Sequence, residues 1–330
     1  MLDPRSPHDN SPPGSAPPPG SAPLSAGTVA FVVLLCALWG GNVVAMKAGL
    51  RGVPPLASGA FRFLLASLTL LVVAWLRRIP LSIPPGLAPH LLALGGLFLV
   101  QHAFLFLGLN LTSASRSTVL IFTQPVFTVL LAHYLIPGEA LSARRAVGTL
   151  VAFAGLLVVF GEGFGRGGWQ TVTGDLLVTG NAVGWALQSI YTKRLIHRAD
   201  PLLLTLSQTV LGAPCFLLAS RLAEPALYTV IDGGIVLAFL YHGSLIAGIT
   251  WVAWTELLRR HQVGHLSAFI FLTPIFGLSL SRLILGDPLT APLVLGLAVV
   301  AGGIALINRP ASAGGLGKCK VQTDNGQVKS

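Results

Sequence analysis

Long apolar runs alternate with short segments rich in proline, glycine and charge from about residue 28 to residue 308. Most runs are about 20 residues long, the length at which an α-helix crosses the hydrocarbon core of a bilayer. The breaks contain pairs such as Asp287-Pro288, an expected N-cap followed by proline at the first helical position. We predict ten membrane-spanning helices, at residues 28–50, 56–76, 88–109, 114–135, 146–162, 174–195, 202–221, 235–258, 264–285 and 291–308.

The composition extends this interpretation to the whole chain. Hydrophobic residues make up 53% of the 330 residues and charged residues 10%, with a mean hydropathy of +0.76. A soluble protein carries about 25% charged residues, so the predicted fold class is an all-α polytopic membrane protein. The lipid bilayer is its expected environment, and the net charge of +10 gives no reason to expect a nucleic-acid partner.

Cysteine and histidine spacing predicts neither a metal site nor a cofactor. Cys36 and Cys215 lie inside apolar runs and Cys319 lies near the C-terminus, which favours small packed thiols over a disulfide framework. His261 and His265 have helical i, i+4 spacing, but no adjacent acid completes a metalloprotease motif.

The distribution of basic residues predicts the orientation. Residues 1–27 are rich in proline, serine, glycine and alanine, which predicts a disordered tail rather than a secretory signal. With that tail inside, fourteen lysines and arginines fall on the cytoplasmic side and five on the other, while Lys47 and Arg62 lie within spans. Because basic loops are retained in the cytoplasm, we predict a multi-pass protein of the cytoplasmic (inner) membrane with residues 1–27 and 309–330 as cytoplasmic tails.

The second half of the chain partly repeats the first. Pro125 matches Pro274 at an offset of 149 residues, and the acids and glycines that follow match at 148. The earlier helices match at 146, which pairs Trp39, Asn42 and Lys47 with Trp185, Gln188 and Lys193. Chance agreement among common residues is the alternative. A duplication predicts five-helix units at 28–162 and 174–308, inverted because each crosses the membrane an odd number of times, with Pro125 and Pro274 as paired hinges.

A set of landmarks then resembles a known family. Ala37-Leu38-Trp39-Gly40-Gly41-Asn42, Lys47, Gly52-Val53-Pro54-Pro55 and Arg62-Phe63 are similar to the opening signature of the EamA-type drug/metabolite transporter permeases. The resemblance covers about residues 28–308 and implies ten helices in two inverted units, in a family whose members often export amino acids, related metabolites or drugs. The related small multidrug transporters carry a glutamate in their first helix, whereas residues 28–50 contain no acid.

Polar and aromatic side chains near the middle of the spans are the candidate solute contacts. Aromatic walls with a few polar groups suit a small amphipathic solute in a dehydrated cavity, and helix–helix packing is the alternative for each residue. The candidates are Trp39, Asn42, Gln101, His102, Gln124, Trp185, Gln188, Tyr241, His242 and Trp251.

Ionisable residues inside a membrane are costly and are therefore candidates for gating or charge. Lys47, near the predicted outer end, either anchors at the interface or binds a solute carboxylate, and Lys193 is its counterpart near the inner end. Arg62 either reaches the interface or pairs with a helix end. For Glu256 the alternatives are a surface ion pair with nearby arginines and proton coupling, and the ion pair is favoured.

These features predict a secondary transporter that moves small organic solutes, such as amino acids or related metabolites, outward by alternating access. No phosphate-binding glycine loop indicates direct use of ATP. The alternatives are an intramembrane enzyme, which would need clustered catalytic groups at depth, and a nucleotide-sugar or drug transporter of related fold. The sequence leaves the cargo, the coupling ion and the oligomeric state open.

Overall fold

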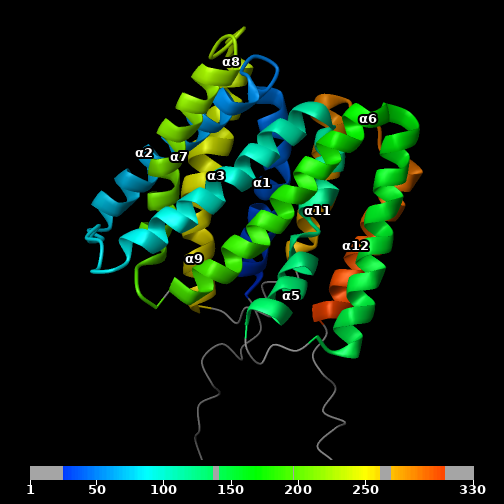
Figure 1. The fold of residues 1–330 in the computed structure, drawn as a ribbon, viewed down its shortest axis with the longest axis horizontal. Coiled ribbons are helices and arrows are strands. Elements are labelled where there is room, and N and C mark those ends of the chain that lie inside the picture. Colours follow the sequence, from blue (N-terminus) through cyan, green and yellow to red (C-terminus); the bar gives the residue numbers. More distant parts are fainter. Residues whose placement is uncertain (1–24, 137–140, 196, 261–268, 309–330) are drawn as a thin grey trace, which may run out of the picture.

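The computed structural model describes residues 25–136, 141–195, 197–260 and 269–308, and all regular secondary structure in these ranges is helical (Figure 1). Eight helices are long and apolar enough to cross a membrane, and Leu272–Leu285 is a shorter apolar helix. This confirms an all-α membrane protein. The predicted tails and the His261/His265 pair lie largely or wholly outside the described residues.

The helices follow one another along the chain with short connections. Their bounds are α1 Ala26–Gly49, α2 Pro55–Leu76, α3 Ala88–Leu111, α4 Ala114–Ile121, α5 Gln124–Leu135, α6 Ala143–Leu195, α7 Pro201–Ala223, α8 Gly233–Phe239, α9 Trp251–Arg260, α11 Leu272–Leu280 and α12 Ala291–Asn308. Two π-helices complete the set, η1 Leu240–Thr250 and η2 Ser281–Leu285.

Helix starts follow the local sequence. The Ser25 hydroxyl accepts a hydrogen bond from the Thr28 backbone N–H at 3.2 Å and begins α1. The Asp200 carboxylate accepts one from Leu202 at 2.8 Å, with proline at the first position of α7. Both arrangements satisfy backbone donors that have no partner within the helix.

The predicted loop at residues 163–173 is wrong in detail. These residues are helical, and Gly168 alone interrupts α6, with φ 62° and ψ −163°. Glycine adopts positive φ without steric cost, so the chain reverses there. One arm of α6 then runs beside α12 and the other beside α3 (Figure 1).

The fourth predicted span is divided into α4 and α5. Pro125 stands in the first turn of α5, where its missing N–H costs nothing, and the chain leaves the helix at Phe122 and Thr123. Pro274 likewise lies in the first turn of α11. Both hinge candidates therefore follow an interruption of helical structure, while their hinge role stays a prediction.

Small residues let α6 and α12 approach closely. A Cβ at Gly148 would lie 2.8 Å from the Gly303 carbonyl oxygen, and one at Gly155 would lie 2.8 Å from that of Gly296. Such contacts are typical of helix packing in membranes. A hydrophobic core between α2, α3 and α7 contains aromatic rings, among them Phe63, Phe98, Phe106 and Phe216.

Candidate functional site

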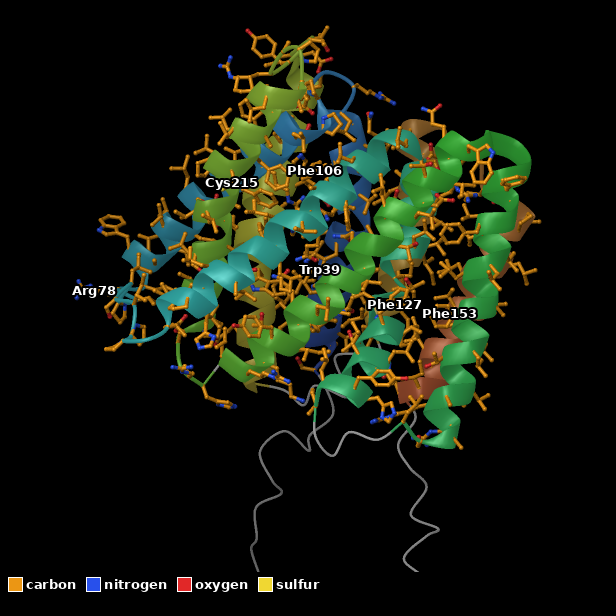
Figure 2. All side chains as sticks on the ribbon, in the orientation of Figure 1. Trp39, Arg78, Phe106, Phe127, Phe153 and Cys215 are labelled. Atoms are coloured by element: carbon orange, nitrogen blue, oxygen red, sulfur yellow. The ribbon has the colours of Figure 1, made fainter. Side chains whose placement is uncertain are left out.

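Trp39 connects α1 to the interrupted helix formed by α8, η1 and α9. Its indole N–H donates to the Thr250 hydroxyl at 2.9 Å, and its ring meets Trp254 edge-on with centroids 5.2 Å apart. One residue earlier on α1, the Leu38 carbonyl accepts a hydrogen bond from the Tyr241 hydroxyl at 2.7 Å. Figure 2 places Trp39 in the middle of the bundle and Arg78 at its edge. Trp39 and Tyr241, two of the predicted solute contacts, thus lie where α1 packs against η1 and α9.

Arg62 lies inside the bundle with its side chain almost fully enclosed. The residue is 7% exposed, its Nη1 donates to Asn42 Oδ1 at 3.0 Å, and its Nε has no hydrogen-bond partner. His242 is fully buried, and neither of its ring nitrogens has a partner. Gly243, the residue after His242, lies close to the Arg62 backbone carbonyl, and the His102 ring packs on Phe63, the residue after Arg62. We call Arg62, Asn42, His102 and His242 the Arg62 cluster.

Neighbouring residues bring the Arg62 cluster together from four helices. A Cβ at Gly243 would lie 3.3 Å from the Arg62 carbonyl oxygen, so this glycine lets η1 approach α2. His102 Nδ1 lies 2.9 Å from the Phe98 carbonyl oxygen on its own helix, and its ring meets Phe63 edge-on at 4.9 Å. One expectation was that Arg62 reaches the membrane–water interface. This expectation is wrong, because the guanidinium turns inward to Asn42.

The remaining polar candidates lie on or beside α6 and make separate contacts. Gln188 Nε2 donates to Gln208 Oε1, and Gln124 Nε2 lies 2.9 Å from Thr128 Oγ1 and 3.4 Å from Ser189 Oγ. Gln101 is buried beside α6, where its backbone carbonyl accepts a hydrogen bond from Asn181 Nδ2 at 3.0 Å, and its side-chain Nε2 has no partner. Trp185 and Trp251 are 39% and 41% exposed. A direct ring contact between Trp39 and Trp185 does not occur within the described residues.

The four charge candidates lie in different settings. Lys47 Nζ donates to the Leu109 and Thr112 carbonyls at 2.6 and 2.8 Å, and so satisfies acceptors at the C-terminus of α3. Lys193 is exposed, and Glu256 is partly buried in α9. Arg62 thus belongs to the Arg62 cluster, whereas Lys47 binds the C-terminal end of α3.

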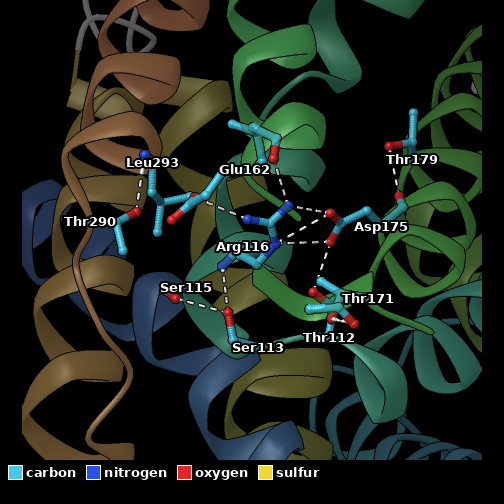
Figure 3. A network of polar contacts seen from close by, with 12 residues as sticks. Thr112, Ser113, Ser115, Arg116, Glu162, Thr171, Asp175, Thr179, Thr290 and Leu293 are labelled. Carbon is cyan, nitrogen blue, oxygen red and sulfur yellow. Dashed lines mark hydrogen bonds and ion pairs between the residues drawn. The ribbon is translucent and has the colours of Figure 1, made fainter. Parts of the chain in front are cut away.

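The strongest ionic network was not predicted from the sequence. Arg116 of α4 lies at the centre of Figure 3, with Asp175 and Glu162 of α6 on either side. Arg116 Nε lies 3.2 Å from Asp175 Oδ2, and Arg116 Nη1 lies 3.0 Å from Glu162 Oε2. Arg116 Nη2 donates to both Asp175 and the Val159 carbonyl. Asp175 is fully buried and accepts a further hydrogen bond from Thr112 at 2.7 Å.

A signal for this network exists in the sequence, since one arginine and two acids stand at the ends of apolar runs. Arg116 is one of the five basic residues expected on the outer side, and no role was expected for the two acids. A cavity of about 220 Å³ lies beside the network, with Thr112, Arg116, Glu162 and Thr171 in its lining.

Two more carboxylates connect distant helices. Asp287 Oδ2 accepts from the Ser115 N–H at 3.0 Å, and the Ser281 hydroxyl also donates to it at 2.5 Å. The expected N-cap role of Asp287 is wrong, because the Thr290 hydroxyl accepts from the first turn of α12 at 3.3 Å. Glu224 accepts from the N–H groups of Leu56 and Ala57 at the start of α2, at 2.7 and 2.9 Å.

Long apolar helices packed around buried polar and charged side chains define this protein as a polytopic helical membrane protein. The class agrees with the family that the sequence matches. The chain belongs to the EamA-like transporter family, whose model matches residues 27–161 and again residues 172–309.

Relatives support the same class. The chain is 28% identical to a Bacillus subtilis protein named uncharacterized transporter YvbV, over 87% of this chain and 93% of that one. It is 25% identical to a probable amino-acid metabolite efflux pump of Escherichia coli, over 84% and 93% of the two chains. A solved structure with 22% identity aligns with a TM-score of 0.59 over 86% of this chain and 98% of its own, which shows a shared fold.

Proposed function

We propose that this protein is a secondary transporter that moves small organic solutes across the cytoplasmic membrane by alternating access. The observation that carries the proposal is the meeting of buried polar and aromatic side chains from both halves of the chain. The Trp39 indole N–H donates to the Thr250 hydroxyl, and the Arg62 cluster includes His242 from the second half, next to the close approach of Gly243 to Arg62. Helices that only span the membrane need no buried polar groups, whereas a solute in a dehydrated passage needs them as binding partners.

The proposed architecture is two inverted five-helix units, at residues 28–162 and 174–308. Two matches to one family model, of similar length and in tandem, support a duplication. An odd number of crossings in each unit inverts the second copy relative to the first. The excess of basic residues in alternate loops supports cytoplasmic termini.

Polar contacts between the units at one end of the bundle support alternating access. This end, which we call the Gly168 end, holds the Gly168 turn, α8 and the connection between α1 and α2 (upper in Figure 1). Arg116 pairs with Asp175, Asp287 with the Ser115 N–H, and Glu224 with the start of α2. Opening toward this side requires these contacts to separate, so the arrangement corresponds to a state that is closed there.

The proposed cargo is an amino acid or a related metabolite, and the proposed direction is export. The support is the Escherichia coli relative, which is named a probable amino-acid metabolite efflux pump. A drug or nucleotide-sugar transporter of related fold is the alternative. An acid for proton exchange is absent from residues 28–50, so any coupling to protons would use another helix.

The test is solute flux into liposomes that contain only this protein. We expect time-dependent, saturable uptake of one or more labelled L-amino acids or metabolites, compared with protein-free liposomes. Trp39→Ala should reduce the rate per folded molecule, because its ring lies at the contact between the halves. Trp75→Ala is the matched control, since Trp75 is 77% exposed at the end of α2. Chemical conversion of a solute without flux would favour the enzyme alternative and refute transport.

A further inference from the structure

The charge of Arg62 has no counter-charge among the described residues. The ion pairs found there both involve Arg116. Arg62 itself is 7% exposed and makes one side-chain hydrogen bond, to the neutral amide of Asn42. Removing a guanidinium from water costs several kcal/mol unless an anion or a full set of acceptors compensates it. Asn42 supplies a single acceptor, so the compensation is incomplete.

Acids elsewhere in the described part of the chain have other partners. Asp175 and Glu162 bind Arg116, Glu224 binds the start of α2, and Asp287 binds the start of α4. The two remaining aspartates cap α7 and α8. Glu256 lies in α9, which follows η1, whereas His242 stands near the start of η1. Glu256 also has an interaction of its own. The anion that Arg62 lacks is therefore not supplied by these side chains.

Unused hydrogen-bonding groups surround the same point. Arg62 Nε has no partner, and His242, at 0% exposure, has none for either ring nitrogen. Buried polar groups are normally paired, and each exception calls for an explanation. His242 stands at the start of η1, and π-helical segments inside helices occur frequently at functional sites. The Arg62 Nε–H and the His242 ring both lack a partner and belong to helices that approach each other at Gly243, and both groups can donate to an anion.

We propose that Arg62, assisted by Asn42 and His242, binds the carboxylate of the transported solute. This inference rests on the proposed transport function and adds the chemical class of the cargo. A single fixed positive charge matches a monoanion, and the guanidinium fork matches the two oxygens of a carboxylate. A phosphate dianion would need further cations, and Lys47, five residues after Asn42 on α1, is bound to the carbonyls of α3.

The rest of the solute has an apolar surface to contact. Trp39 lies three residues before Asn42 and shares its helical face, and Trp254 packs against the Trp39 ring. Asn42 and Arg62 each lie seven residues from the helix end at the Gly168 end, which is about 10 Å of helix rise. A carboxylate at Arg62 would therefore sit below that closed end, with its apolar part directed toward Trp39 and the middle of the bundle.

Thermal unfolding of the purified full chain in detergent tests the site with matched pairs of probes. The pairs are 4-methylpentanoate with 4-methylpentanamide and L-phenylalanine with L-phenylalaninamide, which differ at the carboxylate. We expect at least one carboxylate to raise the melting temperature of the wild type and its amide to leave it unchanged. Arg62→Met should remove the carboxylate shift, with at least a tenfold loss in affinity. Arg282→Gln, which removes an exposed guanidinium, should keep the shift.

A purely structural role for Arg62 predicts a different pattern. If Arg62 only supports the fold, Arg62→Met lowers the melting temperature without ligand. A buried cation without a counter-ion predicts an unchanged or higher value, because the variant removes the desolvation cost. Arg62→Lys should retain part of the carboxylate shift, since it keeps the charge but not the planar fork.

Three results would overturn the inference: equal stabilisation by carboxylate and amide, an unchanged carboxylate shift in Arg62→Met, or no shift of the wild type by either carboxylate. Flux of neutral or cationic solutes alone in liposomes would also overturn it and leave the transport proposal intact. Carboxylate binding without flux of any solute would instead contradict transport while the binding site stands.

Discussion

Asp175→Asn tests whether the Arg116 network is a buried ion pair that stabilises the fold. The substitution keeps the shape of the side chain and removes its charge. Asp175 is fully buried, while the side chains of Arg116 and Glu162 are 10% and 6% exposed. Removing one member of a buried pair costs about 3–5 kcal/mol, because the other charge stays buried. Arg116 keeps Glu162 at 3.0 Å, so we expect a cost near the lower end of that range.

Arg116→Gln should cost more, near the upper end of the same range. It leaves two carboxylates close together, of which Asp175 retains only the hydrogen bond from Thr112. In the double variant neither Arg116 nor Asp175 is left charged. Its cost should therefore fall short of the sum of the single costs by about 1–3 kcal/mol, the coupling typical of residues in one network.

The assay is unfolding in mixed micelles with increasing sodium dodecyl sulfate, followed by tryptophan fluorescence. Asp200→Asn is the matched control, because Asp200 is an exposed N-cap and asparagine caps helices about as well. It should change the free energy of unfolding by less than about 0.5 kcal/mol. A cost below about 1 kcal/mol for Asp175→Asn would place the pair with solvated surface ion pairs. Additive single costs would likewise refute the coupled network.

Three further predictions concern packing, the centre of the bundle and topology. Gly303→Ala should lower the free energy of unfolding by about 1–3 kcal/mol, since its Cβ would lie 2.5 Å from a carbonyl oxygen of α6; Gly302→Ala, with nothing within 4 Å, should be neutral or stabilising in the same titration. Trp39→Phe should cost about 1 kcal/mol, the net value of its hydrogen bond, yet keep flux if the solute contacts the ring; loss of flux equal to that of the alanine variant would contradict this. Cysteines introduced at Ser82 and Gln170 should react with an impermeant maleimide from opposite sides of the membrane, and labelling from one side would refute the inverted units.

The sequence alone was sufficient for the membrane class and for most helix bounds. The predicted spans 56–76 and 291–308 correspond to α2 Pro55–Leu76 and α12 Ala291–Asn308. Transfer of an apolar run into lipid and the backbone constraints of proline are properties of short segments. They can be read along the chain without knowing what each segment touches. The family landmarks between Ala37 and Phe63 are local in the same sense.

Only the tertiary structure decided which polar side chains meet. Arg116 and Asp175 are 59 residues apart in the chain, and Arg62 reaches Asn42 from another helix. Such pairs depend on how each helix is rotated about its axis and how closely its neighbours approach. Contacts such as that of Gly148 with Gly303 set that approach. The π-helix η1, which holds His242, also had no recognised signal in the sequence. Apolarity determines that a segment crosses the membrane, whereas helix packing determines the direction in which each of its side chains points.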